Sequence, residues 1–249
     1  MSGWSSPERA VAAMAAGTGA GVRVAVLDSG IEISHPEFAG KTLRDDCAVA
    51  EDGTLSALGG EGADAYGHGT AVAGMIWKTA PAAEIGSFRV LSAKLSARTA
   101  AVALAAERAI GLGYHILNCS FACGFAAHLP IYKQWLDRAY LAGVHVVAAS
   151  DSTLQPEWPA HFPHVIGVSS AGRGEPGALL QGGPGLIEFS SPTENSLLPW
   201  KGGGCRTLTG SSFAAARVSG LVARILSAEA SPDALQMKAL LRQIAIRAA

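Results

Sequence analysis

The stretch V-A-V-L-D-S-G, from Val24 to Gly30, decides the fold of this 249-residue chain. The apolar run from Val22 to Leu27 has the length of a buried strand, and it ends at Asp28, just before a glycine turn. Similar apolar runs follow at 84–91, 114–120, 144–149 and 165–168. Helical patterns lie at 68–77, 96–111, 130–143, 212–228 and from Pro232 onward. This alternation predicts a three-layer α/β fold, a parallel sheet with helices on both faces.

The composition is that of a globular protein. Hydrophobic residues make up 49% of the chain and charged residues 16%, so we expect one domain over residues 1–249 with a sizeable core. The net charge of −1 offers no basic face for nucleic acid. No apolar run reaches the roughly 18 residues that span a membrane. Residues 1–9 lack the pattern of a signal peptide, so we expect a cytoplasmic protein.

The four cysteines do not form a dense disulfide pattern in a chain of this length. Without a signal peptide, reduced thiols are expected. Cys119 and Cys123 have the spacing C-x-x-x-C without a second ligand pair, so small buried residues are favoured over a zinc site. We expect no metal and no cofactor.

Three polar residues stand where predicted elements begin or end. Asp28 follows the first strand, His68 opens a helix between two glycines, and Ser212 opens a long apolar helix. Each alone has an ordinary explanation: a turn for Asp28, a glycine-rich turn for His68 and a helix cap for Ser212. Together they supply a carboxylate, a base and a hydroxyl, in one of the orders that build a nucleophilic triad. In a parallel sheet we expect them at the carboxyl ends of the strands.

The motifs around these residues resemble those of the subtilisin-like serine proteases, or subtilases. The family shows V-A-V-I-D-T-G, G-H-G-T-H-V-A-G and G-T-S-M-A-A-P-H-V-A-G. This chain has V-A-V-L-D-S-G, G-H-G-T-A-V-A-G and G-S-S-F-A-A-A-R-V-S-G, starting at Val24, Gly67 and Gly210. The resemblance implies a subtilisin-like fold and a serine endopeptidase that works through an acyl-enzyme. In it Ser212 attacks, His68 moves the proton and Asp28 orients the histidine.

The resemblance also implies a cleft for a peptide or protein substrate. Asn118-Cys119-Ser120 matches the family's N-x-S strand end, and an extended peptide would pair with the backbone that follows as an added strand. The segment from Trp158 to Val168 resembles one that helps form the specificity pocket. The substrate-binding residues expected from this match are Ser120, Phe121, Ala122, Cys123, Gly124, Ala148, Ala149 and Ser150. The sequence makes no prediction of oligomeric state.

One position departs from the family pattern. Where subtilases have V-V-A-A-A-G-N, this chain has V-V-A-A-S-D, from Val146 to Asp151. The resemblance therefore places Asp151, with the Ser212 N–H, at the oxyanion position. An asparagine amide donates to the oxyanion, whereas an ionised aspartate repels it and a protonated one donates. Three interpretations remain: a protease with a mildly acidic optimum or a narrow substrate range, a weak triad kept as a binding scaffold, or a local misalignment.

Several family features are missing from the sequence. The chain passes directly from Trp77 to the strand at 84–91, without the calcium loop of many subtilases, so Glu37 has no partner ligands and we expect no tight calcium site. The charges at Asp45, Asp46, Glu51 and Asp52 are expected to form a solvated loop, with a weak calcium site as the alternative. We expect no prodomain, and a mobile surface loop over 172–185.

Two other functions compete with general proteolysis. The first is a processing protease or macrocyclase for one precursor peptide, in which an amine replaces water at the acyl-enzyme. The second is a catalytically weak pseudoprotease that binds an extended peptide.

Overall fold

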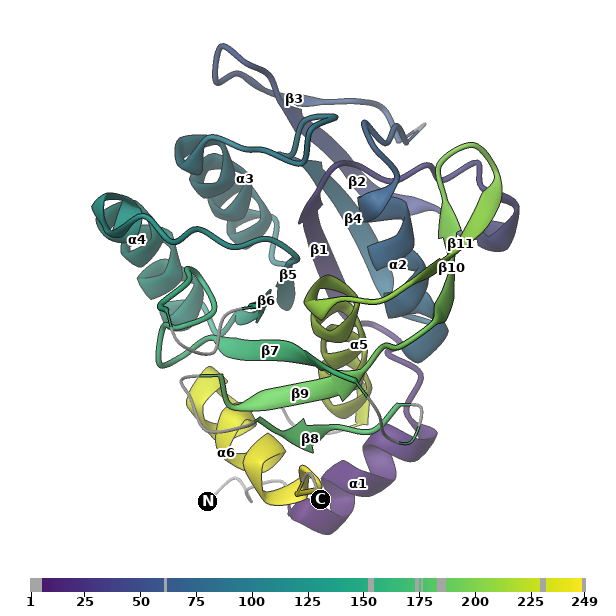
Figure 1. The fold of residues 1–249 in the computed structure, drawn as a ribbon, viewed down its shortest axis with the longest axis vertical. Helices are drawn as coiled ribbons and strands as arrows, with labels where there is room; N and C mark the ends of the chain where they lie inside the picture. The colour runs from purple at the N-terminus through teal and green to yellow at the C-terminus, as the bar shows by residue number, and fades with distance from the viewer. Residues whose placement is uncertain are drawn as a thin grey trace.

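A nine-stranded sheet forms the middle layer of the protein (Figure 1). The computed structural model describes residues 6–60, 62–151, 155–172, 175, 177–182, 187–228 and 232–247. Within them the strand order is β3-β2-β4-β1-β5-β6-β7-β9-β8, and all neighbours are parallel except the edge strands β3 and β8. The strands of this sheet are β1 Arg23–Asp28, β2 Leu43–Val49, β3 Leu55–Ala57, β4 Glu84–Arg89, β5 Ile116–Cys119, β6 His145–Ala149, β7 Ile166–Ala171, β8 Leu180–Gln181 and β9 Phe189–Pro192. A separate antiparallel hairpin consists of β10 Ser196–Trp200 and β11 Gly204–Leu208.

Helices cover both faces of the sheet, which gives the predicted three-layer α/β fold. α3 and α4 lie on one side and α2 and α5 on the other, with α1 beside α5 and α6 beside α1 (Figure 1). The helices are α1 Pro7–Ala16, α2 His68–Thr79, α3 Thr99–Gly111, α4 Leu129–Leu141, α5 Ser211–Ala228 and α6 Ala234–Ile244, with short 3₁₀ turns at Pro36–Phe38 and Ala126–His128. No helix in the described ranges is long and apolar enough to cross a membrane.

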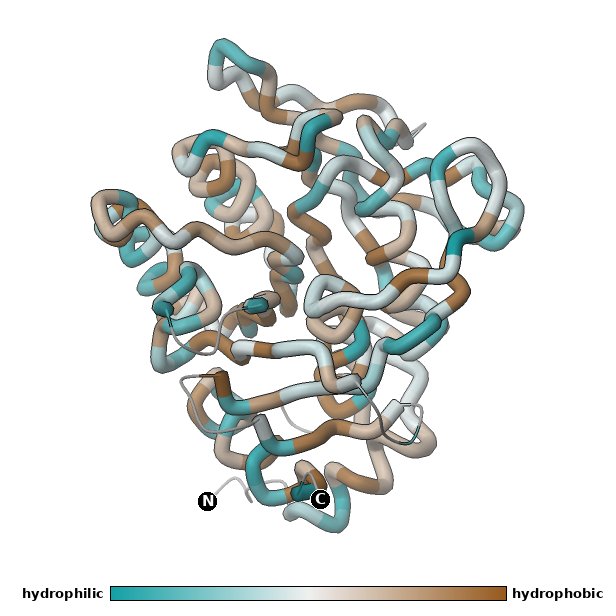
Figure 2. The backbone as a smooth tube through the Cα atoms, in the orientation of Figure 1, coloured by the Kyte–Doolittle hydropathy of each residue, from teal (hydrophilic) through white to brown (hydrophobic). Residues whose placement is uncertain are grey.

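Strand β1 shows why the central strands are apolar throughout. Val24 and Val26 enter the core beneath α2 and α5, whereas Ala25 and Leu27 enter the core beneath α3 and α4. Successive side chains point to opposite faces, so a strand covered on both sides needs an unbroken apolar run. Figure 2 shows this concentration of hydrophobic residues along the central strands.

The strands and helices that the sequence predicts are present, with boundaries shifted by a few residues. The helix expected at 96–111 begins only at Thr99. The preceding residues instead form a turn, in which the Ser92 N–H donates to the Ser96 carbonyl at 2.9 Å and Leu95 has a φ of 55°. The sequence analysis did not predict α1, β2, β3 or β8 to β11.

The expectation of a solvated loop at Asp45 and Asp46 is wrong. Both residues lie in β2, where Asp46 is only 5% exposed and accepts a hydrogen bond from the Gly62 N–H at 3.1 Å. Asp45 accepts from the Tyr114 hydroxyl at 2.7 Å. The polar side chains of Asp45 and Asp46 interrupt the apolar pattern of β2, so the sequence did not indicate a strand there.

The surface loop predicted at 172–185 is also incorrect in part. Leu180 and Gln181 form β8, which pairs with β9. Residues 173, 174, 176 and 183–185 of that stretch lie outside the described residues.

Candidate active site

Asp28, the last residue of β1, lies at the carboxyl edge of the sheet and is fully buried. Its Oδ1 accepts the Ser29 N–H at 2.7 Å. Both carboxylate oxygens face Nδ1 of His68, at 2.8 and 3.0 Å. This contact fixes the orientation of the imidazole and leaves Nε2 as the nitrogen that is free to exchange a proton.

His68 is the first residue of α2, and the glycines on either side of it bring that helix end close to its neighbours. A Cβ at Gly67, where φ is 121°, would lie 2.5 Å from the Trp200 ring. A Cβ at Gly69 would lie 2.1 Å from the Gly30 carbonyl oxygen. Real Cβ atoms do not approach so closely, so both positions require glycine for α2 to reach Asp28.

Asp64, a residue that the sequence analysis missed, holds the segment that leads into His68. Its side chain is buried, and Oδ1 accepts from the Ser29 hydroxyl at 2.7 Å and from the backbone N–H groups of Tyr66 and Gly67 at 2.9 and 2.7 Å. Oδ2 accepts from the Thr70 N–H and hydroxyl at 2.9 and 2.6 Å. We call these residues the Asp64 network; it ties the end of β1 to the first turn of α2.

The carboxylates of Asp28 and Asp64 affect the pKa of His68. Burial is the largest single effect and lowers the pKa of His68, but the Asp28 carboxylate, through its charge and hydrogen bond, and the Asp64 charge raise it. The raising effects prevail, so the pKa of His68 lies above the usual value for histidine.

Ser212 lies in the first turn of α5, where backbone N–H groups have no acceptor within the helix. Its hydroxyl donates to the Ser120 carbonyl at 3.3 Å, and the Ser120 hydroxyl donates to the Ser212 carbonyl at 3.0 Å. Among the described residues the Ser212 hydroxyl makes no hydrogen bond to His68. The Phe213 ring packs against the imidazole, with 5.6 Å between the ring centres.

A buried chain of hydrogen bonds sets the position of this turn. Ser219 donates to Asn118 Oδ1 at 2.9 Å, and Asn118 Nδ2 donates to Ser120 Oγ at 2.9 Å. Ser120 in turn contacts Ser212. The polar chain joins the end of β5 to two turns of α5, so it fixes α5 along its axis relative to the sheet.

Asp151 follows the carboxyl end of β6 and is exposed. Its backbone N–H donates to the Glu157 carboxylate at 3.2 Å, and the Ser150 hydroxyl donates to the same carboxylate at 2.6 Å. Within the part of the chain that the structure describes, the Asp151 side chain has no hydrogen bond or ion pair to His68 or Ser212.

The expected cleft residues differ in what they offer a ligand. Cys123 pairs with Trp158 through two backbone hydrogen bonds of 2.9 Å, so its N–H and carbonyl are occupied. Alternate residues of an extended segment face the other way, so the backbone groups of Ala122 and Gly124 are directed away from Trp158. Phe121 keeps a partly buried side chain.

The three residues expected in the β6 wall are buried. Ala148 packs in the core beneath α3 and α4, and Ala149 packs in the core beneath α2 and α5. Ser150 is 1% exposed. Their side chains therefore support the site from below.

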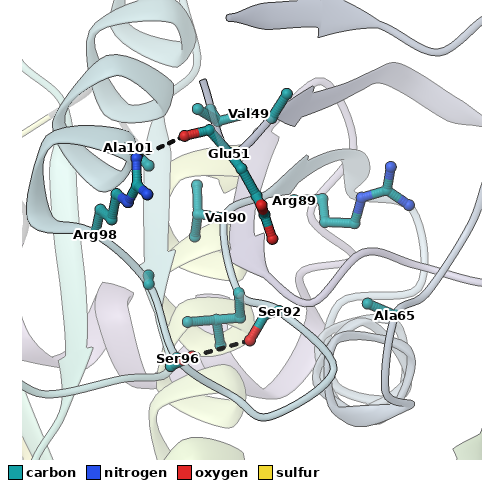
Figure 3. A pocket seen from close by; sticks show the side chains of 12 residues that line it. Val49, Glu51, Ala65, Arg89, Val90, Ser92, Ser96, Arg98 and Ala101 are labelled. Carbon is teal, nitrogen blue, oxygen red and sulfur yellow. Dashed lines mark hydrogen bonds between the residues drawn. The ribbon is translucent and has the colours of Figure 1, made fainter. Parts of the chain in front are cut away.

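Two cavities lie beside this edge of the sheet. The larger, of about 520 Å³, opens between the ends of β2 and β4 and the start of α3. Figure 3 shows Arg98 directed at the Glu51 backbone carbonyl, 2.6 Å away, and the Ser92 and Ser96 hydroxyls, which lie 2.9 Å apart. The smaller, of about 280 Å³, lies between the turn before α3 and the segment after β5. Across the described residues, no group of three or more His, Cys, Asp or Glu side chains could hold a metal ion.

The comparison with protein families matches residues 19–248 to the subtilase family. The chain belongs to this family. Its similarity to curated subtilases is moderate: it is 30% identical over 223 residues to subtilisin-like protease 3 of Arthroderma otae, covering 84% of this chain and 53% of that protein. It is 31% identical over 221 residues to a thermostable alkaline protease of Halalkalibacterium halodurans, covering 84% and 58%. This subtilase chain thus spans about half the length of the curated relatives it matches.

Solved structures support the subtilisin-like fold. A cold-adapted subtilisin-like serine proteinase aligns with a TM-score of 0.74 at 24% identity, covering 92% of this subtilase and 83% of that chain. Sphericase aligns with a TM-score of 0.76 at 24% identity, covering 91% and 83%.

Two polar residues of this subtilase could have been found from the sequence. Asp64 stands four residues before His68, and Ser219 stands seven residues, or two helical turns, after Ser212. An acidic residue before a helix start and a serine on the face shared with Ser212 were both available as signals. Their partners, however, come from distant segments that no local pattern indicates.

Proposed function

We propose that this subtilase is a serine endopeptidase in which Ser212 is the nucleophile, His68 the general base and Asp28 the residue that orients the base. The observation that carries the proposal is the contact of both Asp28 oxygens with His68 Nδ1, at 2.8 and 3.0 Å. A buried carboxylate in that position stabilises the imidazolium that forms when Nε2 accepts the serine proton.

The reaction requires the Ser212 hydroxyl to leave the Ser120 carbonyl and approach Nε2. The present contact is long, at 3.3 Å, and rotation about one side-chain bond exchanges such partners. Catalytic hydrogen bonds are often loose before substrate binds and tighten in the complex. The oxygen then attacks the scissile carbonyl, His68 gives the proton to the leaving amine, and water releases the acyl group.

The developing oxyanion would be stabilised by the N–H of Ser212 at the positive end of α5. Asp151 takes the place of the second donor. A carboxylate at this position lacks the amide donor of asparagine, so the oxyanion would lose one hydrogen bond and acylation would be slower. We therefore propose a subtilase with restrained activity at neutral pH.

The peptide substrate would lie along Ser120, Ala122 and Gly124, as an added strand. The raised pKa of His68 argues against a mildly acidic optimum, since the imidazole must be neutral to accept a proton. All four cysteines are free thiols, which suits the cytoplasmic location that we also propose.

The test is labelling by a fluorophosphonate from pH 4.5 to 9. Wild-type protein should be labelled, and Ser212→Ala should not, with Ser211→Ala as the matched control on the neighbouring serine. Folded wild-type protein that resists labelling at every pH would refute the proposal and favour a peptide-binding pseudoprotease.

A second measurement separates hydrolysis from cyclisation. The mass of the product decides, because a head-to-tail ring is one water lighter than the linear peptide. We expect linear products. Cyclic products would assign the macrocyclase function instead.

A further inference from the structure

The smaller cavity contains a thiol next to a histidine. The apolar part of its wall is formed by Leu91, Leu95, Val102, Phe121, Phe125 and Tyr132. Cys123, His128, Thr99 and Ser96 contribute polar groups. The cavity lies between the turn before α3 and the segment after β5, which flank the proposed substrate path. A group bound in the cavity would contact both segments.

Cys123 is half-buried, and its Sγ lies 3.5 Å from Nδ1 of His128. The same nitrogen lies 2.8 Å from the Thr99 hydroxyl. When the imidazole proton is on Nε2, Nδ1 accepts from both the hydroxyl and the thiol. His128 is thus positioned to take the thiol proton and generate the nucleophilic thiolate.

The other three cysteines lack this combination. Cys47 and Cys119 are buried, and burial raises the pKa of each thiol. Cys205 is exposed on β11, and among the described residues no histidine is hydrogen-bonded to it. Cys123 therefore combines partial access, a proton acceptor and an adjoining cavity.

We propose that Cys123 is a modification site for low-molecular-weight disulfides. The Cys123 thiolate attacks one sulfur of the disulfide, the new S–S bond forms as the old one breaks, and the other half leaves as a thiolate. The leaving thiolate takes up the proton that His128 held. Cys123 is oxidised and half of the disulfide is reduced, so no other oxidant is needed, and a reducing thiol reverses the step.

The adduct would obstruct peptide binding. It occupies a cavity of about 280 Å³, the space of a small ligand or one large side chain, directly behind Ala122 and Gly124. This regulatory consequence rests on the proposed function, whereas the thiol exchange does not.

The chemical test uses the full chain with Cys205→Ser, which removes the exposed thiol and should leave activity unchanged. Treatment with glutathione disulfide should add one glutathionyl group, and peptide mapping should place it on Cys123. The adduct should disappear with dithiothreitol, and His128→Gln should slow its formation several-fold. No adduct on folded protein, or one on another cysteine, would overturn the proposal, as would a His128→Gln variant that reacts at the wild-type rate.

The functional test compares two reactions of the same treated sample. Hydrolysis of a peptide long enough to reach the cavity should fall, while fluorophosphonate labelling of Ser212 should persist because that small probe does not extend to Cys123. The Cys123→Ser variant should hydrolyse the peptide at the same rate with and without glutathione disulfide. If untreated protein is not labelled, the proposed function fails and the exchange at Cys123 still stands on its mass. If the adduct forms and peptide hydrolysis is unchanged, the regulatory role is refuted.

Discussion

The surroundings of His68 and of Asp151 differ in how tightly they hold their side chains. His68 is fixed by a fully buried carboxylate, by two glycines that admit no Cβ, and by the Asp64 network behind them. Asp151 is exposed, and the contact it makes among the described residues is the donation of its backbone N–H to Glu157. In the proposed function, the base is therefore organised before substrate arrives, whereas the side chain at the oxyanion position is exposed. We therefore expect activity to be limited at the oxyanion and not at the base.

The largest expected effect tests the base. Asp28→Asn should lower kcat by roughly ten-thousand-fold, because an amide favours the wrong imidazole tautomer and does not stabilise the imidazolium. Turnover of a peptide substrate measures it. Asp52→Asn, an exposed carboxylate in the turn after β2, is the control and should retain full activity. A kcat for Asp28→Asn within tenfold of the wild-type value would contradict the proposed role of Asp28 in orienting the base.

The next effect tests the oxyanion side. Asp151→Asn replaces the charge with a donor, and since one such donor is worth about a hundred- to thousand-fold, labelling and turnover at pH 7 should rise at least tenfold. Glu157→Gln removes the neighbouring charge without adding a donor at the same position, so it should have a smaller effect. If both variants gained the same activity, the gain would come from removing negative charge near the site and not from a new donor at position 151.

A third prediction concerns the proton affinity of His68. Activity requires the neutral imidazole, so it is present above the raised pKa of His68 and is lost as pH falls through that value. Asp64→Asn removes one charge that raises this pKa, so the acid limb of the kcat/KM profile should move to lower pH.

The same change has a cost in stability. An amide at position 64 would turn donors toward donors in the Asp64 network, and the free energy of unfolding should fall by about 3 kcal/mol. Thr70→Val removes the hydroxyl that donates to Asp64 and accepts the Glu32 N–H, but it keeps the Asp64 charge. It should destabilise less and leave the acid limb in place. A limb that moves equally in both variants would contradict a charge effect of Asp64.

The smallest effect comes from Ser29, which joins Asp64 to α2 by donating to the carboxylate at 2.7 Å and accepting the Gly69 N–H at 3.0 Å. Ser29→Ala should lower the free energy of unfolding by about 1 to 2 kcal/mol, measured by denaturant titration. Ser92→Ala at an exposed turn should stay within about 0.5 kcal/mol. If both variants had the same free energy of unfolding, the Ser29 hydroxyl would not contribute to the stability of the Asp64 network.

The sequence predicted those parts of the fold whose pattern is local. The apolar run before Asp28 marks β1, because both faces of that strand are covered. Asp45 and Asp46 concealed β2, because their partners, Tyr114 and Gly62, are distant in the chain. The positions of His68 and Ser212 at helix starts followed from the motifs. Asp64 and Ser219 could be noticed as polar residues, but the partners through which they support the site could not be derived. Such support depends on which segments the fold brings together.

Leu91, Ser96 and Ala97 line both the cavity of Figure 3 and the smaller cavity with Cys123. The loop that holds these residues thus separates the two cavities. Any small molecule that binds the larger space and prefers one arrangement of this loop changes peptide affinity on the other side. Thermodynamic reciprocity requires the peptide to change the affinity of that molecule by the same factor. In the proposed function, a ligand of the larger space would therefore act on peptide affinity without competing for Ser212.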